Sequence, residues 1–180
     1  MPDLVIRRAE LSDVDRLAEL RRIWSVEQYG LIEDPDFGKQ FAQWWEREFP
    51  RRLTWFAEVD GEPVGMLNVA VFDRMPRPGQ VPGRWGYLGN AFVLYRYRNA
   101  GIGRRLLDAA IEHARVRGFV RLVLSPSERS VPFYRRSGFR PATSLLLLAL
   151  DDPTPVDDDR LDLDWFGDDA GGAGAAAGIP

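Results

Sequence analysis

Two glycines one residue apart, Gly101 and Gly103, interrupt the chain between two regular patterns. The run WGYLGNAFVL at 85–94 has the apolar composition of a strand, and the residues after Gly103 repeat apolar side chains at helical spacing. A helix that begins here presents the unpaired N–H groups and the positive dipole end of its first turn. Because glycine lets a ligand approach that backbone closely, the segment predicts an anion site, with phosphate as the usual occupant.

The glycine spacing does not fit the common nucleotide-binding motifs. The phosphate loop of nucleotide hydrolases needs a Lys followed by Ser or Thr, which is absent here, and the dinucleotide motif needs a third glycine where this chain has Leu106. Three arginines, Arg98, Arg104 and Arg105, would add positive charge around the glycines. Two interpretations stay open at this point, a phosphate site of another kind or a tight turn from strand to helix without a ligand.

The apolar patterns elsewhere predict an α/β domain over residues 1–150. We expect strands over 4–9, on either side of the Asp60–Gly61 turn, over 85–94 and 120–125, and one or two more within 139–150. Helices are expected from Ser12 or Asp13, over 37–49, after Gly103 and over 131–136. This order predicts a mixed sheet with helices on its faces.

Charge is divided unevenly along the chain. Residues 151–180 hold nine acidic residues and one arginine, and the whole chain has a net charge of −3, so residues 1–150 carry a net charge of +5. We expect 151–180 to be an acidic, low-complexity tail that is largely disordered. A scattered charge of +5 suits a small anionic ligand and does not by itself indicate a nucleic-acid partner.

The sequence lacks cysteine and long apolar runs. Without cysteine the chain has no disulfides and no thiolate chemistry of its own. No run approaches the length of about 18 apolar residues that a membrane helix needs, and the charged N-terminus has no apolar core of a secretory signal. We therefore expect a cytoplasmic protein without a membrane partner.

Two motifs together resemble one known family. Arg98-Asn99-Ala100-Gly101-Ile102-Gly103 is similar to the R-x-x-G-x-G/A motif of the GCN5-related N-acetyltransferases (the GNAT family), and Phe133 to Phe139 resembles the family's FYxxxGF signature. The resemblance covers about residues 4–150. It implies a GNAT-like fold with a central, mixed and mostly antiparallel sheet, and it implies acetyl-CoA as the co-substrate without a metal.

The resemblance also assigns residues to the binding of acetyl-CoA. Main-chain groups at the strand end would contact the pantetheine arm, and the backbone of the glycine loop would hold the pyrophosphate. Ser127 stands where the family often has an asparagine that touches pantetheine, and Ser130 stands where it often has alanine. The implied binding residues are Phe92, Val93, Leu94, Arg98, Asn99, Ala100, Gly101, Ile102, Gly103, Arg104, Ser127, Ser130 and Phe133.

Tyr134 is the expected catalytic residue. A phenol with an ordinary pKa of about 10 is protonated at neutral pH and can donate a proton to the departing thiolate of coenzyme A. The alternative is a core aromatic ring whose hydroxyl reaches water. The backbone N–H near Val93 or Leu94 would polarise the thioester carbonyl as an oxyanion donor does.

The general base cannot be assigned from the sequence. Many relatives use a glutamate on the strand before the glycine loop, whereas residues 85–94 contain no carboxylate and only Asn90 as a polar residue. Other candidates are Glu33, Asp34, Asp36 and Asp73, each of which is also compatible with a solvated surface charge. A water relay is the other possibility. We expect the single histidine, His113, to lie exposed on its helix and not to be catalytic.

Together these features predict an acetyl-CoA-dependent N-acetyltransferase. It would transfer an acetyl group to a primary amine of a small molecule or protein by direct attack, and it would have no nucleic-acid partner. The missing strand carboxylate leaves a second hypothesis, a catalytically inactive acyl-CoA-binding sensor or regulatory module. The acyl acceptor cannot be read from the sequence, and a homodimer is possible because relatives are often dimers.

Overall fold

The computed structural model describes residues 3–31, 33–143 and 145. The chain forms two compact units, Met1–Leu124 and Ser125–Pro180, and each is considered by itself below. The acidic tail predicted at 151–180 lies outside the described residues, and so does most of the segment 139–150 in which further strands are expected. The assignment of 1–150 to one domain therefore stays a prediction.

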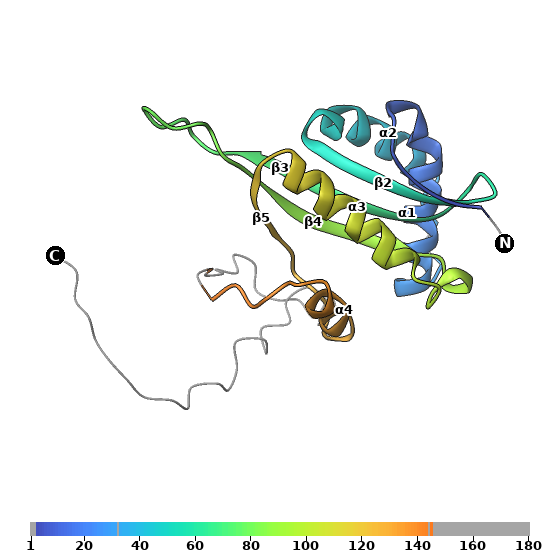
Figure 1. The fold of residues 1–180 in the computed structure, drawn as a ribbon. Helices are drawn as coiled ribbons and strands as arrows, with labels where there is room; N and C mark the ends of the chain where they lie inside the picture. The colour runs from blue at the N-terminus through green and yellow to red at the C-terminus, as the bar shows by residue number, and fades with distance from the viewer. Residues whose placement is uncertain (1–2, 32, 144, 146–180) are drawn as a thin grey trace, which may run out of the picture. The chain divides into compact units, whose positions relative to one another are not determined.

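A five-stranded sheet forms the centre of the first unit. Its strands are β1 (Leu4–Arg8), β2 (Arg52–Val59), β3 (Glu62–Asp73), β4 (Arg84–Val93) and β5 (Phe119–Val123). They lie in the order β1-β2-β3-β4-β5, with three antiparallel pairings and a parallel pairing of β4 with β5. Figure 1 shows β5 reached through a helix that crosses the sheet. This arrangement confirms the predicted mixed, mostly antiparallel sheet.

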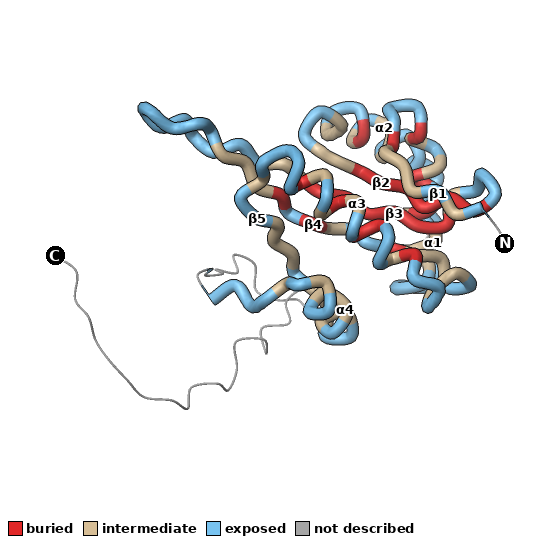
Figure 2. The backbone as a smooth tube through the Cα atoms, viewed as in Figure 1, coloured by how far each residue is buried: buried red, intermediate tan, exposed pale blue. Residues whose placement is uncertain are grey.

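Helices cover the two faces of this sheet. The first two are α1 (Val14–Tyr29) and α2 (Phe37–Glu48), and the third is α3 (Ile102–Val116). Neighbouring residues of a strand point to opposite faces. Phe56 accordingly packs among α1 and α2 side chains such as Leu20 and Trp45, whereas the ring of Trp55 meets that of His113 on α3. Figure 2 shows the buried residues concentrated along the central strands between these helices.

The Asp60–Gly61 turn between β2 and β3 is confirmed. Both residues have positive φ, 52° for Asp60 and 83° for Gly61, which is the backbone of a type I′ turn. The twist of this turn matches that of the flanking strands, so a short local motif fixes the register of Val59 opposite Glu62. The same register orients Phe56 and Met66 toward α1 and α2.

Candidate active site

Strand β4 extends well beyond its parallel neighbour. The pairing with β5 runs only from Arg84, opposite Phe119, to Tyr87, opposite Val123. β4 then continues to Val93 while it remains paired with β3 on its other side. In the described part of the chain, the later residues of β4 therefore have no strand on the β5 side. An unpaired strand edge presents a row of N–H and C=O groups that a ligand can use.

A β-bulge lies within this free stretch of β4. Met66 of β3 is opposite Phe92 and Asn68 is opposite Gly89, so β4 contains one residue more than β3 over this segment. Asn90 has a positive φ of 54°, a conformation that asparagine tolerates better than most residues. After the bulge, Phe92 is buried and its ring stacks on Trp24 of α1 at 5.7 Å. The bulge thus sets the direction in which the end of β4 presents its backbone.

The two candidate oxyanion amides at the end of β4 differ in orientation. The N–H of Leu94 donates to the carbonyl oxygen of Val64 at 2.9 Å, so this amide is already used within the sheet. Val93 is opposite Gly65, and the alternation of an antiparallel ladder directs its N–H and C=O away from β3. Only the Val93 amide of this pair faces the free edge of β4.

The glycine loop joins this edge to α3 through left-handed backbone. Asn99 has φ of 63° and Gly101 has φ of 77°. The N–H of Arg105 donates to the carbonyl of Gly101 at 3.1 Å, which is the first bond of the helix. The amides of Ile102, Gly103 and Arg104 therefore precede the helical ladder, as expected for an N-terminus. The helix begins one or two residues earlier than the sequence indicated.

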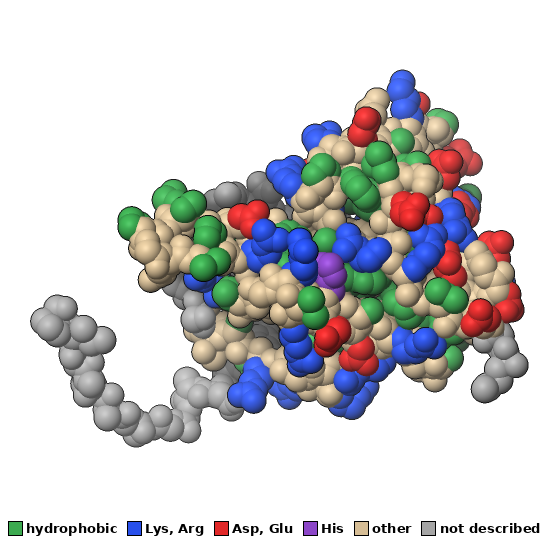
Figure 3. Space-filling view, turned by 45° about the horizontal axis from the view of Figure 1, so that its top comes forward, with side chains coloured by type: hydrophobic (Ala, Val, Ile, Leu, Met, Phe, Trp, Pro, Cys, Tyr) green, Lys and Arg blue, Asp and Glu red, His purple; other side chains and the backbone are tan. Residues whose placement is uncertain are grey.

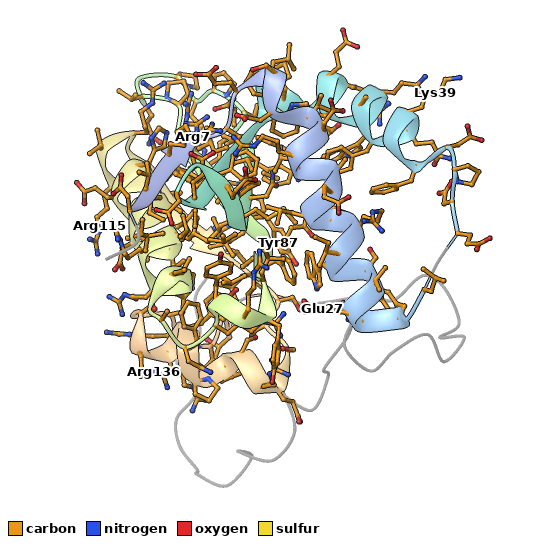
Figure 4. All side chains as sticks on the ribbon, turned by 90° about the vertical axis from the view of Figure 1, so that its right-hand side faces the viewer. Arg7, Glu27, Lys39, Tyr87, Arg115 and Arg136 are labelled. Atoms are coloured by element: carbon orange, nitrogen blue, oxygen red, sulfur yellow. The ribbon has the colours of Figure 1, made fainter. Side chains whose placement is uncertain are left out.

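The side chain of Arg98 is directed back into the protein. Its Nε donates to the carbonyl of Val93 at 2.8 Å, and its guanidinium forms an ion pair with Glu27 at the end of α1. Figure 4 shows Glu27 at this end of α1. The charge that the sequence placed on the loop at Arg98 is thus partly neutralised. Sequence reasoning did not find Glu27, because no local pattern relates residues 71 positions apart.

The other two arginines at the loop also have protein partners. Arg104 donates from Nε to both carboxylate oxygens of Asp108, at 2.8 and 2.9 Å, and Arg105 donates to the carbonyl of Leu4 at 3.2 Å. Their side chains are therefore directed along the helix and toward β1. The charge of Arg104 is balanced by Asp108, whereas Arg105 keeps its positive charge beside the backbone N–H groups and the dipole of α3.

In the second unit, two serines form the start of a short helix. Helix α4 (Val131–Arg136) follows a single 3₁₀ turn. The hydroxyl of Ser130 donates to the carbonyl of Ser127 at 2.8 Å, and the two hydroxyl oxygens lie 3.1 Å apart. Both side chains thus stabilise the turn before α4. Pro132 lies in the first turn of this helix, where its missing N–H costs no intrahelical hydrogen bond.

Tyr134 is held on α4 by two aromatic neighbours. The rings of Phe133 and Phe139 meet it edge-on, at 5.0 and 5.7 Å between centroids. Burial raises the pKa of the Tyr134 hydroxyl above its ordinary value. A raised pKa keeps the phenol protonated at neutral and moderately alkaline pH, which is the state that a general acid requires.

The candidate bases are all at the surface. Glu33, Asp34 and Asp36 are exposed, and Asp34 accepts a hydrogen bond from the backbone N–H of Asp36 in the turn before α2. Asp73 is paired with Arg84 at 3.3 Å, where β3 and β4 begin their pairing. That end of the strand pair is about 27 Å from Val93. Asp73 therefore lies at the other end of β3 and β4 from the proposed oxyanion amide, which argues against it as the base.

The sequence predicted an exposed His113, but the structure shows it only partly exposed. Its ring is partly buried and meets Trp55 edge-on at 5.6 Å. Burial, followed by the charges of Arg8 and Arg117, lowers the pKa of His113. The prediction was wrong because a helical pattern shows which side of a helix is polar, but not that a large ring on β2 covers that side.

Two further features of the described residues bear on the type of site. No group of three or more His, Cys, Asp or Glu side chains in this part of the chain is arranged to hold a metal ion. None of its helices combines the length and the apolar character that crossing a membrane requires.

Comparisons with known proteins agree with this geometry. The profile of the acetyltransferase (GNAT) family matches residues 17–139. A glucosamine 6-phosphate N-acetyltransferase of Trypanosoma brucei brucei is 32% identical over 80 residues, which are 44% of this chain and 52% of that protein. An N-alpha-acetyltransferase of Sulfurisphaera tokodaii is 31% identical over 109 residues, 59% of this chain and 60% of that protein. The chain thus spans little more than half the length of these curated relatives.

A solved structure shows the same fold. A predicted acetyltransferase from Clostridium acetobutylicum, crystallised with acetyl-CoA, superimposes with a TM-score of 0.67 at 23% identity, over 82% of this chain and 97% of that one. At this identity the likeness concerns the fold alone. The family profile, in contrast, covers both the glycine loop and Tyr134, and by this match over more than half of its length the chain belongs to the GNAT family of acetyltransferases.

Proposed function

We propose that the protein is an N-acetyltransferase that uses acetyl-CoA to acetylate a primary amine of a small molecule or a protein by direct attack. The observation that carries the proposal is the continuity of two binding elements. The free edge of β4, ending at Val93, leads directly into a loop whose left-handed Gly101 exposes the first amides of α3. An extended ligand with amide groups at one end and a pyrophosphate at the other fits this sequence of elements.

The residues of the loop fit the pyrophosphate of acetyl-CoA. The amides of Ile102, Gly103 and Arg104 supply N–H donors at the positive end of α3, and no atom of the described residues lies within 4 Å of the position that a Cβ on Gly101 would take. Arg98 contributes by holding the loop, since its side chain is directed to Val93 and Glu27. Asn99 and Ala100 would contribute backbone only. Phe92 and Leu94 would orient the end of β4. Contacts of acetyl-CoA with Ser127, Ser130 and Phe133 stay predictions.

Acetyl-CoA, when bound, supplies the reactive thioester. The N–H of Val93 is the donor that we assign to the carbonyl oxygen, because the amide of Leu94 is occupied by Val64. Tyr134 is the acid that we assign to the leaving sulfur, and the raised pKa keeps its proton available. The attacking amine must be neutral. Since β4 carries no carboxylate and the exposed Glu33, Asp34 and Asp36 lie in surface turns, we assign removal of the amine proton to water.

The names of two relatives suggest which acceptors to test first. One relative acts on glucosamine 6-phosphate and the other is an N-alpha-acetyltransferase. These represent a phosphorylated amino sugar and the amino terminus of a polypeptide, which are both primary amines. We take both classes as the leading acceptors of this protein. The cytoplasmic location and a homodimer stay predictions.

The alternative function is an inactive acyl-CoA-binding module. Asn90, at the bulge of β4, occupies the strand on which many relatives place a catalytic glutamate, and an amide cannot accept a proton at neutral pH. Such a module would retain the loop and the strand edge but would not complete the transfer. The presence of Tyr134 argues for the enzyme, because binding alone does not require a partly buried phenol at this position.

The two functions are separated by one pair of measurements. Release of the coenzyme A thiol is followed with acetyl-CoA and a panel containing glucosamine 6-phosphate, short peptides with free amino termini and simple alkylamines. Binding of coenzyme A is measured in parallel by calorimetry. We expect turnover with at least one amine, and a large loss of kcat in Tyr134→Phe with coenzyme binding retained. Tight coenzyme binding without turnover on any amine would instead establish the binding module.

A further inference from the structure

A second cluster of basic side chains lies at the other end of α3 from the glycine loop. The guanidinium of Arg8, on edge strand β1, lies over the ring of Trp55 at 5.1 Å, and His113 meets the same ring edge-on at 5.6 Å. The N–H of Arg117, the residue that follows α3, donates to the carbonyl of His113 at 2.9 Å, so these residues lie one turn apart at that end of the helix. In Figure 3 the histidine lies at the surface with basic side chains on two sides.

The charges of this cluster are not balanced within the described protein. Arg7, the preceding residue, pairs with Asp13 and Glu58, whereas neither Arg8 nor Arg117 has an acidic partner among the residues that the structure describes. The Nε of Arg8 is buried and has no hydrogen-bond partner in the described part of the chain. Burial, and then the charge of Arg117, lowers the pKa of Arg8. A buried donor without an acceptor and two like charges near one another are each unfavourable in the unliganded protein.

Ordinary structural roles account for only part of this arrangement. The negative end of the α3 dipole favours basic residues near the last turn, which explains Arg115 and Arg117. The Trp55 ring stabilises a guanidinium that lies over its face. Neither effect supplies an acceptor for the buried Nε of Arg8. The Nε of Arg8 is closed to solvent, so an anion bound between Arg8 and Arg117 would accept from the terminal nitrogens of the two guanidinium groups and would offset their repulsion.

We propose that Arg8, His113 and Arg117 form a binding site for a small oxyanion, a phosphate or carboxylate group, that is separate from the acetyl-CoA site. Helix α3 runs from Ile102 to Val116, so about 20 Å of helix separates this cluster from the glycine loop. The two arginines provide N–H donors in the fork geometry that suits oxyanions. His113 adds a donor and a positive charge when it is protonated, so binding of the anion is linked to uptake of a proton.

The only histidine of the chain makes the site measurable. The ring proton resonances of His113 are followed by NMR in the full chain while inorganic phosphate is added, with sodium chloride at matched ionic strength as the reference. We expect a saturable shift with phosphate, and a pH titration in which phosphate raises the pKa of His113. A shift of equal size with chloride, or one that grows in proportion to salt without saturation, would overturn the proposal.

Substitutions at the cluster provide the specificity test. Arg8→Gln and Arg117→Gln should each weaken phosphate binding about tenfold, since each removes a charge-assisted donor. Arg115→Gln is the matched control, because Arg115 is an exposed residue near the same helix end and lies on the outer side of the molecule in Figure 4. Arg117 is exposed, so its variant should fold even if Arg8→Gln does not. Equal weakening in Arg115→Gln would show a diffuse charge effect and refute the site.

A last experiment tests whether the oxyanion is free phosphate or a carboxylate of the chain itself. The chain itself carries carboxylates outside the described residues, among them Asp157, Asp158 and Asp159. The His113 titration is therefore repeated on the full chain with these three residues changed to Asn. If free phosphate is the ligand, the titration without phosphate is unchanged by this substitution. If carboxylates of the chain occupy the site, the substitution lowers the pKa of His113 and strengthens phosphate binding. If the pKa of His113 changes neither with added phosphate nor with these substitutions, the proposal is wrong.

Discussion

Glu27, in the last turn of α1, forms an ion pair with Arg98, which lies between β4 and α3. The same arginine donates to the carbonyl of Val93 at 2.8 Å, and its guanidinium lies over the ring of Phe92 at 5.6 Å. One side chain thus links α1, the end of β4 and the glycine loop. These contacts of Arg98 fix the positions of the three parts relative to one another, and all three bear on the proposed acetyl-CoA site.

Removing the acidic partner should weaken coenzyme binding more than stability. In Glu27→Gln, Arg98 loses its ion pair, and the loop becomes freer to leave the geometry that presents the amides of α3. We expect the dissociation constant for coenzyme A to rise about fivefold, and the free energy of unfolding to fall by less than about 1 kcal/mol, as for partly exposed pairs. Calorimetry and urea unfolding measure the two quantities.

The same helix offers a control for Glu27→Gln. Glu19 pairs with Arg22 one turn apart on α1, with about half of each side chain exposed. Glu19→Gln should leave the affinity for coenzyme A unchanged. If both variants bind coenzyme A equally well, the Glu27–Arg98 pair has no positioning role.

Gly101 should be needed for its backbone conformation. Its φ of 77° is strained for any residue with a Cβ, although the structure describes no atom within 4 Å of the Cβ position. Gly101→Ala should therefore lower the free energy of unfolding by about 1–2 kcal/mol through the backbone alone. It should also weaken coenzyme A binding at least tenfold, because relaxation of φ moves the first amides of α3.

Gly118, just after α3, is the matched control for this substitution. It has a φ of 68° and equally open surroundings, at the opposite end of the helix. Gly118→Ala should cost a similar free energy of unfolding and leave coenzyme A binding intact. An equal loss of coenzyme affinity in the two variants would mean that general destabilisation explains the effect.

Local chemistry explains which parts of the fold could be predicted. The Asp60–Gly61 turn was predictable because a type I′ turn needs two residues that accept positive φ. The left-handed Gly101 likewise follows from the glycine itself. The bulge at Asn90 had a weak local signal, since Asn tolerates left-handed backbone, but the register shift against β3 is a property of two strands.

Contacts between distant segments account for what the sequence left open. Nothing near Arg98 indicates that its side chain is directed toward Glu27, and nothing near His113 indicates that Trp55 covers it. The choice between Val93 and Leu94 as oxyanion donor required the hydrogen bond from Leu94 to Val64. In each case the two residues belong to different helices, strands or loops, and they come close only when the chain is folded.

Tyr134→Phe should affect kcat and leave acetyl-CoA binding almost unchanged. General acid catalysis typically contributes a factor of about 10² to 10⁴, and we expect a loss of kcat at the lower end of that range. Burial raises the pKa of Tyr134, so the phenol keeps its proton until the pH exceeds about 10. The wild-type kcat should therefore show no decline up to that pH. A decline of kcat beginning near neutral pH, and absent from Tyr134→Phe, would contradict this assignment.

Asp13 should make the stability of the protein sensitive to acid. The hydrogen bonds from Arg7, at 2.7 and 2.8 Å, are the main reason that the pKa of this carboxyl lies below its ordinary value, and the backbone N–H of Glu10 donates to it as well. A pKa that is lower in the folded state means that the unfolded chain binds the proton first. The stabilisation is thus complete above the unfolded pKa of about 4 and is lost as the pH falls through the folded value.

Asp13→Asn should remove this contribution. The side chain of Asp13 is 9% exposed, and loss of its charge leaves Arg7 with Glu58 as its one acidic partner among the described residues, so we expect the free energy of unfolding at neutral pH to fall by about 2–3 kcal/mol. Below a pH of about 4 the variant should lose stability less steeply than the wild type. Urea unfolding over this pH range measures both effects, with Asp15→Asn, an exposed site two residues along the chain, as the control. Parallel curves for wild type and Asp13→Asn below that pH would show that another carboxyl group causes the acid sensitivity.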